Sequence, residues 1–144
     1  MREIKFRAKD ERGKWHYGYY VDGYMIDDGQ AVTVPFIVQT QLEGKVRVVP
    51  QTVSEYTGFK DKNGNEIYEG SSDGFYVVKM GLFPIRDFDS GEKIEMAHGW
   101  YMDPIDKSVE PFNWEIPLTD YYINRLDDGF DKNIYDNPEL LETK

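Results

Sequence analysis

The residues best suited to chemistry lie in one stretch, YTGFKDKNGNEIYEG at 56–70, where Asp61, Asn63 and Asn65 alternate like the oxygen ligands of a calcium loop. Glu69 offers a further carboxylate. An EF-hand loop needs glycine at its sixth position, whereas the glycine here stands at the fourth. Asn-Gly between alternating apolar and polar residues is the strongest short signal for a β-hairpin turn. The spacing therefore favours a hairpin over a metal loop.

Other groups with catalytic potential are scattered. Neither His16 nor His98 accompanies a serine in a Gly-x-Ser-x-Gly elbow, and we interpret both histidines as structural. The pairs Asp27–Asp28 and Asp127–Asp128 stand beside glycines, which is typical of solvated turns. No Gly-x-Gly-x-x-Gly or Walker loop occurs. The sequence therefore predicts no catalytic, cofactor-binding or metal-binding residue.

Short segments of alternating hydrophobicity predict a mainly β chain, a meander with a small barrel-like sheet. Ile4, Phe6 and Ala8 alternate with charged residues and should face a core. Asp22-Gly23 reads as a turn, and Pro35 favours an edge or bulge position. Besides the hairpin, the predicted strands are residues 2–8, 14–21, 24–26, 31–38, 45–49, 75–83, 92–97 and 99–102.

One or two short helices complete the prediction. The Ser/Thr-x-x-Glu spacing of Thr52–Glu55 indicates one or two helical turns that end at Gly58. Leu118–Leu126 suits either a helix, with Thr119 as its cap, or a strand. Asn137–Leu141 begins with a capping asparagine followed by proline and predicts a helix start.

Length and composition describe an ordinary cytoplasmic protein. The 144 residues match one domain, 1–144, with any subdivision expected near Gly70–Phe75. Cysteine is absent, which is typical of a reducing compartment. The charged start, MREIKFRA, and the lack of long apolar runs argue against secretion and membrane insertion.

Charge is distributed unevenly along the chain. The net charge of -10 repels phosphate, so we expect no direct nucleic-acid binding. The first fourteen residues are basic and the C-terminal third is acidic. We interpret both as solvated surface, with a contact between the two ends, inside one chain or across a homo-oligomer, as the alternative. The many aromatic residues suit a β core and could also form a protein-binding surface.

Three blocks together resemble the YopX-like family of phage and prophage proteins. They are MREIKFRA at 1–8, the hairpin segment at 56–70 and NIYDNPELLE at 133–142. The family commonly continues Gly-Asp after the hairpin, whereas Ser71–Gly74 follows here and predicts a turn. It also tends to place Ile-Gly where Asp131-Lys132 stands. The resemblance implies a β-rich fold with a small barrel and a phage or prophage origin in a bacterial cell, and it brings no catalytic residues.

The functional prediction follows from these observations. We expect a non-enzymatic cytoplasmic protein that acts by protein contact, as a homo-oligomer, with a host or phage protein as a further partner. The alternative is an acidic mimic of a nucleic acid that occupies a host protein. An enzyme is the third class, and it depends only on carboxylate-rich turns and His98.

Overall fold

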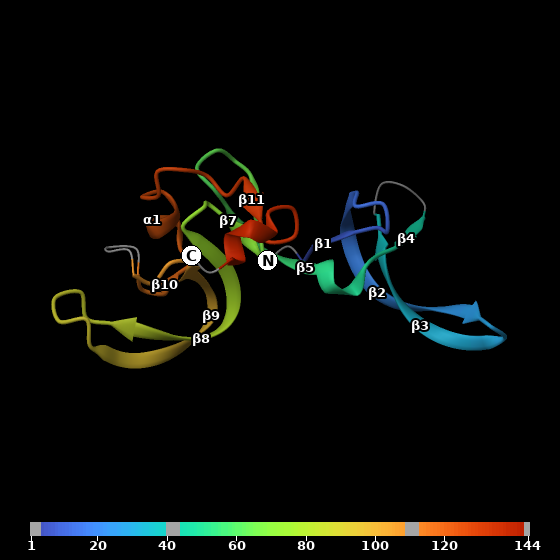
Figure 1. The fold of residues 1–144 in the computed structure, drawn as a ribbon, viewed down its shortest axis with the longest axis horizontal. Helices are drawn as coiled ribbons and strands as arrows, with labels where there is room; N and C mark the ends of the chain where they lie inside the picture. The colour runs from blue at the N-terminus through green and yellow to red at the C-terminus, as the bar shows by residue number, and fades with distance from the viewer. Residues whose placement is uncertain (1–3, 40–43, 109–112, 143–144) are drawn as a thin grey trace. The chain divides into compact units, whose positions relative to one another are not determined.

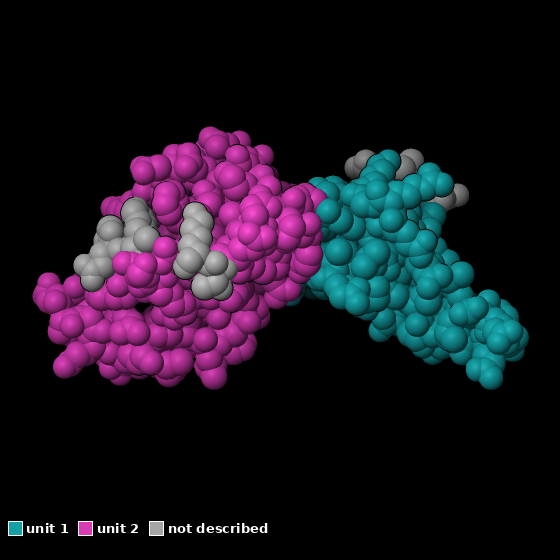
Figure 2. All heavy atoms as spheres, viewed as in Figure 1, with its two compact units in different colours: residues 1–58 teal, residues 59–144 magenta. Residues whose placement is uncertain are grey.

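The computed structural model describes residues 4–39, 44–108 and 113–142. The chain divides into two compact units, Met1–Gly58 and Phe59–Lys144 (Figure 2). Gly70–Phe75, where the sequence suggested any subdivision, lies within the second unit. Residues 2–3 of the first predicted strand and residues 40–43 of the loop expected before Lys45 lie outside the described residues.

The first unit is an antiparallel sheet in the order β4-β3-β2-β1-β5 (Figure 1). Ala8 is fully buried with Ile37 and Val48, and Phe6 packs beside them, as the alternation of the first strand predicts, whereas Ile4 lies before β1 and is 59% exposed. The strands are β1 (Phe6–Lys9), β2 (Trp15–Asp27), β3 (Gln30–Val38), β4 (Lys45–Arg47) and β5 (Ser54–Lys60).

The turn predicted at Asp22-Gly23 is wrong, because β2 continues through both residues. A Cβ atom added at Gly23 would lie 2.5 Å from the Phe36 ring, so the glycine makes room for a cross-strand aromatic residue. The chain turns instead at Asp28-Gly29, whose φ angles of 52° and 76° are both left-handed. These angles fit a two-residue hairpin turn, which closes a long β2–β3 ribbon.

The helix predicted at Thr52–Glu55 is also wrong. A single 3₁₀ turn, η1 (Pro50–Thr52), precedes β5, which begins at Ser54. The Thr52 hydroxyl donates to the Val49 carbonyl oxygen at 2.7 Å and accepts from the Lys9 amide at 2.9 Å. The threonine therefore joins two segments of the unit rather than capping a helix, and pairing with β1 satisfies the backbone that follows it.

The predicted hairpin is confirmed, and β5 runs past the unit boundary to pair with β6 (Glu66–Tyr68). The Asp61 amide donates to the Asn65 carbonyl oxygen at 2.9 Å, which leaves a three-residue loop rather than the two-residue turn expected. Gly64 has a φ of 84°, whereas Asn63 is not among the described residues with positive φ. This pattern fits a type I turn followed by a left-handed glycine.

The second unit contains an antiparallel sheet in the order β10-β9-β8-β7-β11 (Figure 1). The strands predicted at 92–97 and 99–102 form one continuous strand, β9. The turn expected at Ser71–Gly74 is shorter, because Ser71 and Ser72 form β7. The strands are β7 (Ser71–Ser72), β8 (Tyr76–Arg86), β9 (Lys93–Pro104), β10 (Ile116–Pro117) and β11 (Lys132–Asn133).

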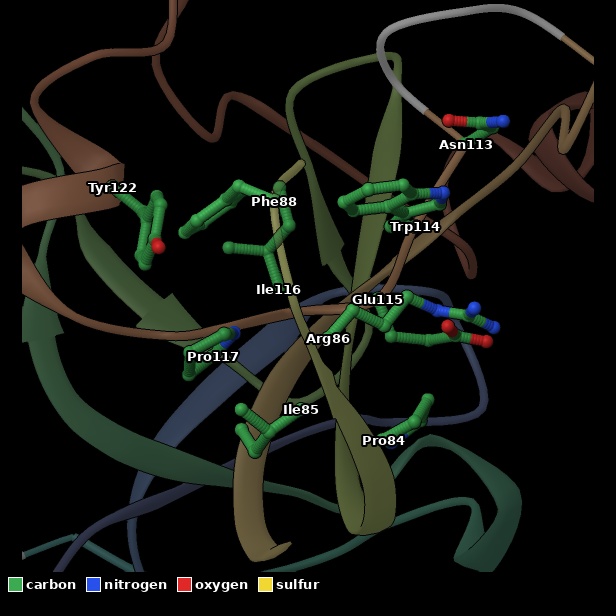
Figure 3. Close-up of a pocket in the computed structure, with 10 residues that line it drawn as sticks. All are labelled: Pro84, Ile85, Arg86, Phe88, Asn113, Trp114, Glu115, Ile116, Pro117 and Tyr122. Atoms are coloured by element: carbon green, nitrogen blue, oxygen red, sulfur yellow. The ribbon is translucent and has the colours of Figure 1, made fainter. Parts of the chain in front are cut away.

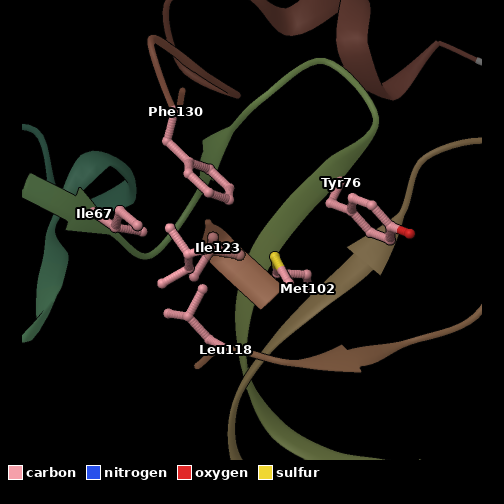
Figure 4. Packing of buried hydrophobic residues seen from close by; sticks show 7 residues of the cluster. Ile67, Tyr76, Met102, Leu118, Ile123 and Phe130 are labelled. Carbon is pink, nitrogen blue, oxygen red and sulfur yellow. The ribbon is translucent and has the colours of Figure 1, made fainter. Parts of the chain in front are cut away.

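Two short helical elements lie in the second unit. The open choice at Leu118–Leu126 resolves to a helix, α1 (Asp120–Ile123), and the Thr119 hydroxyl accepts from the Tyr122 amide at 3.3 Å. The predicted C-terminal helix is a 3₁₀ turn, η2 (Pro138–Leu141). The buried core of this unit comprises Ile67, Tyr76, Val78, Met102, Leu118, Ile123 and Phe130 (Figure 4).

The mainly β fold class is confirmed, with two antiparallel sheets and short helical turns. Neither sheet closes into a barrel within the described residues, so the small barrel is not observed. No helix in the described part of the chain is long and apolar enough to cross a membrane.

Candidate functional site

Asp61, the first candidate ligand of the motif, binds amides instead of a metal. Its Oδ1 accepts from the backbone amides of Asn63 and Asn65, both at 2.9 Å. Its Oδ2 accepts from the Phe130 amide at 2.8 Å and from the Asn65 side chain at 3.2 Å. Burial raises the pKa of Asp61, but these donors lower it by more, and the pKa lies below its ordinary value. The carboxylate is therefore a structural anchor.

The same turn also holds the chain between Leu126 and Phe130. Lys62 Nζ donates to the Leu126 carbonyl oxygen at 3.0 Å and also contacts the Asp127 carbonyl oxygen. A Cβ atom added at Gly129 would lie 2.7 Å from both Asp61 Oδ2 and Asn63 Nδ2, so only glycine fits there without movement. The turn thus serves as a docking site for a segment more than sixty residues away.

The third sequence block packs against the residues that follow the hairpin. β11 pairs with β7, and the Ile134 amide donates to the Gly70 carbonyl oxygen at 3.0 Å. Asn133 Oδ1 accepts from the amides of Tyr135 and Asp136 at 3.0 and 2.9 Å. The second and third blocks are therefore parts of one packed structure, which gives them a folding role.

The two histidines belong to different units. The Gln39 side-chain amide lies 3.1 Å from His16 Nδ1, which accepts, so Nε2 carries the proton and donates to Asp10 Oδ2 at 2.8 Å. This bond and the Lys14 amide lower the pKa of Asp10 to about 2. His98 is exposed on β9 opposite Leu82.

Of the carboxylate pairs expected in turns, Asp27 is the last residue of β2 and the other three lie in turns or bends. Asp28 forms the β2–β3 turn, and Asp127 and Asp128 are exposed in the segment that docks on Lys62. Among the described residues no three His, Asp or Glu side chains are grouped to hold a metal. Asp73 is a second buried carboxylate besides Asp61: burial raises its pKa, and its Oδ1 accepts from the Phe75 and Tyr76 amides.

One face of the β2–β3 ribbon is apolar along its whole length. Strand alternation and the observed register place paired residues on the same face. Tyr19, Val21 and Met25 remain 52%, 39% and 38% exposed there, whereas Val34 and Phe36 are buried. We call this surface the β2–β3 face, and it comprises Tyr19, Val21 and Met25 from β2 with Val32, Val34, Phe36 and Val38 from β3.

Charged residues lie at both ends of the β2–β3 face and also across it. Asp27 and Asp28 stand at the turn that closes the ribbon. At the other end Lys45 Nζ lies 4.5 Å from the centroid of the Phe36 ring. Arg47, which pairs with Phe36, reaches Met25 with Nη1 3.8 Å from the sulfur.

A pocket of about 450 Å³ lies in the second unit, between the far end of the β8–β9 ribbon and the chain around β10 (Figure 3). The rings of Phe88 and Trp114 stack with centroids 6.4 Å apart, and the Arg86 guanidinium lies 5.8 Å from the Trp114 ring. The lining residues are Pro84, Ile85, Arg86, Phe88, Asn113, Trp114, Glu115, Ile116, Pro117 and Tyr122.

No short sequence motif predicts this pocket. Its aromatic walls come from three segments: the β8–β9 turn, the residues before β10, and α1. Only the pairing of β9 with both β8 and β10 brings the first two segments together. From the sequence, we interpret the aromatic residues in those segments as core residues. The only sequence signal for a pocket is the large number of aromatic residues in the chain.

The fold and these sites define a two-unit, mainly β protein in which the family motifs serve packing. The family model described as YopX protein matches residues 5–93, which is more than half of the chain. The chain therefore belongs to the YopX family. The match includes the hairpin block, whereas NIYDNPELLE lies outside it. No curated protein matches the chain.

Proposed function

We propose that this YopX-family protein acts by protein–protein contact rather than by catalysis, and that it self-associates through the β2–β3 face. The observation that carries the proposal is the exposure of Tyr19, Val21 and Met25 on one face of that ribbon. Contiguous apolar surface on a soluble protein marks interaction sites. The family resemblance supports a phage or prophage origin and action in the bacterial cytoplasm.

A second copy suits this surface because its charges are self-complementary. If two ribbons stack face to face in opposite directions, Asp27 and Asp28 of each copy lie over Lys45 of the other. A two-fold axis repeats the contact, as in most homodimers. Complementary charges of this kind fix the direction of packing and exclude the parallel arrangement.

The free edge of the ribbon supports packing by its face. The chain covers the edge of β3 as far as Pro35, since β4 pairs with Phe36 to Val38 and the Val48 amide donates to the Pro35 carbonyl oxygen at 3.2 Å. Proline at an edge is a common protection against edge-to-edge pairing. The ribbon is therefore suited to a face-to-face contact rather than to extension of the sheet.

The first test is light scattering with size-exclusion chromatography between about 1 and 100 µM, a range typical of transient association. The expected result is a concentration-dependent dimer for the wild type. Val21→Asp places a charge at the centre of the face and should weaken association at least about tenfold. Leu82→Asp, a matched change on the exposed part of β8, should leave it unchanged.

A wild type that stays monomeric throughout this range would exclude self-association. Dissociation by Leu82→Asp but not by Val21→Asp would place the contact on the other ribbon. Circular dichroism of both variants confirms that each is folded before its association is interpreted.

A second candidate function is mimicry of a nucleic acid. Residues 1–58 hold eight basic and eight acidic residues, so the whole charge of -10 belongs to residues 59–144. A concentrated negative charge attracts proteins that bind polyanions. Affinity capture from bacterial lysate at low and high salt tests this candidate, and recovery of no basic nucleic-acid-binding protein would refute it.

A further inference from the structure

The pocket of the second unit has the size and lining of a binding site for one large apolar group. Its volume of about 450 Å³ falls in the range of ligand pockets, roughly 300 to 1,000 Å³. Figure 3 shows Phe88, Trp114, Ile116 and Tyr122 arranged around one space. Tryptophan, tyrosine and arginine together in a pocket are typical of the residues that dominate binding energy at protein interfaces.

The pocket adjoins an exposed apolar strip on the β8–β9 ribbon. Pro84 lines the pocket, and strand alternation puts Leu82 on the same face, with Met96 paired to Pro84. Leu82 and Met96 are 65% and 55% exposed. An enclosed small-molecule site needs no such strip, whereas a polypeptide lying along the ribbon would cover it.

The strip belongs to a part of the ribbon that projects beyond the rest of its sheet. β7 pairs with β8 only at Val77, and β10 pairs with β9 only at Tyr101 and Met102. Beyond these residues β8 and β9 pair only with each other among the described strands. Pro84 offers no amide to an added strand, so the ribbon again presents its face rather than its edge.

Charge defines the second property of the occupant. The unit carries the whole net charge of -10, and Asp87 and Asp89 flank Phe88 at the pocket. Inside the pocket the two charged lining residues, Arg86 and Glu115, are of opposite sign. The surroundings therefore attract cationic segments and repel acidic ones.

We infer that this pocket binds a large apolar side chain of a partner polypeptide in which lysine or arginine flanks that side chain. The apolar group enters between Phe88, Trp114 and Tyr122, and the chain on either side follows the exposed strip of the ribbon. This contact is separate from the β2–β3 face, so failure of self-association would not affect it.

Heteronuclear NMR of the full-length, ¹⁵N-labelled protein tests the inference with three peptides. They are acetyl-KKSFSKK-amide, its alanine twin acetyl-KKSASKK-amide and its acidic twin acetyl-EESFSEE-amide. The readout is the indole N–H signal of Trp114. The Trp100 indole nitrogen is buried without a hydrogen-bond partner among the described residues, and its signal is an internal reference that should not move.

The expected result is saturable movement of the Trp114 signal with the phenylalanine peptide. The alanine and acidic twins should each bind at least about tenfold more weakly, the first for lack of the anchor and the second through repulsion. Equal binding of the phenylalanine and alanine peptides, or of the basic and acidic ones, would overturn the inference, as would no movement at Trp114.

Variants localise the binding. Phe88 is 73% exposed, so Phe88→Ala should fold normally and weaken the phenylalanine peptide by about tenfold. Phe75→Ala removes another exposed phenylalanine of the same unit and should change nothing. Free indole is the last probe: if it saturates the pocket as tightly as the peptide does, the site takes a small aromatic molecule and the polypeptide inference is wrong.

Discussion

At the residue scale, Asp61 connects its own turn to a distant part of the chain. The side chain is only 6% exposed and accepts three backbone amides and one side-chain amide. Asp61→Ala would leave the buried Phe130 amide without an acceptor and remove the hydrogen bonds of the turn, and it should lower the free energy of unfolding by about 1 to 3 kcal/mol. Urea denaturation followed by circular dichroism measures the change.

Asp89→Ala is the matched control, because Asp89 is an exposed aspartate in another turn. Its free energy of unfolding should stay within about 0.5 kcal/mol of the wild type. An Asp61→Ala protein as stable as this control would show that the carboxylate is not an anchor. Calcium should stabilise neither protein, since the oxygen atoms of Asp61 already accept amide hydrogens.

The lowered pKa of Asp10 makes the stability of the first unit depend on pH. The His16 hydrogen bond, with help from the Lys14 amide, lowers the pKa of Asp10 from 3.8 to about 2. A depressed pKa in the folded state stabilises the fold above the unfolded pKa, and this stabilisation is lost as pH falls from about 4 to about 2. Asp10→Asn should therefore reduce the loss of stability across this interval.

Urea midpoints measured at several pH values between 2 and 5 check this expectation. Asp89→Asn again serves as the control and should keep the wild-type slope. The same slope in Asp10→Asn and in the wild type would mean that the Asp10–His16 pair does not contribute.

At the scale of elements, the approach of residues 126–130 to the hairpin depends on Gly129. An alanine there would place its Cβ 2.7 Å from Asp61 Oδ2. We expect Gly129→Ala to cost about 1 to 3 kcal/mol of stability through this overlap. Gly99→Ala is the control, since its Cβ would meet nothing within 4 Å. Thermal unfolding that shows equal stability for the two variants would contradict this packing.

Elements with strong local signals were predictable from the sequence. Asn63-Gly64 gave the hairpin, and the alternation of Phe6 and Ala8 gave the buried face of β1. Local sequence signals failed where a residue distant in the sequence determines the local structure. The sequence around Gly23 predicts a turn, but in the structure the Phe36 ring lies over this glycine. Thr52 is predicted to cap a helix, but in the structure its hydroxyl accepts a hydrogen bond from the Lys9 amide.

The candidate sites were less predictable than the fold. Opposed aromatic residues such as Phe88 and Trp114 are more than twenty residues apart, and their contact depends on the pairing of β9 with both β8 and β10. Sequence periodicity locates strands but does not say which strand projects beyond its sheet. The exposed apolar faces therefore become visible only once the register is known.

At the scale of the whole molecule, the chain separates its charge between two units. The first unit is neutral as a whole, yet it places Asp27 and Asp28 at one end of the β2–β3 face and Lys45 at the other. The second unit carries the entire net charge of -10, and it also contains the aromatic pocket. We therefore propose that the first unit contacts the first unit of another copy of the chain, and that the second unit contacts a basic partner polypeptide.

The most direct test of self-association is a charge exchange between two variants. Asp27→Lys with Asp28→Lys makes the tip of the ribbon basic, and Lys45→Glu with Arg47→Glu makes its base acidic. Each variant alone brings like charges together twice in the antiparallel dimer and should be monomeric. A mixture of the two restores both opposite-charge contacts.

Sedimentation velocity of each variant and of their equimolar mixture decides the matter. The account predicts monomers in the separate samples and a heterodimer in the mixture, weakened as salt is raised. Homodimers as tight as the wild type in either separate sample, or a mixture that stays monomeric although both variants are folded, would contradict the antiparallel contact of the β2–β3 faces.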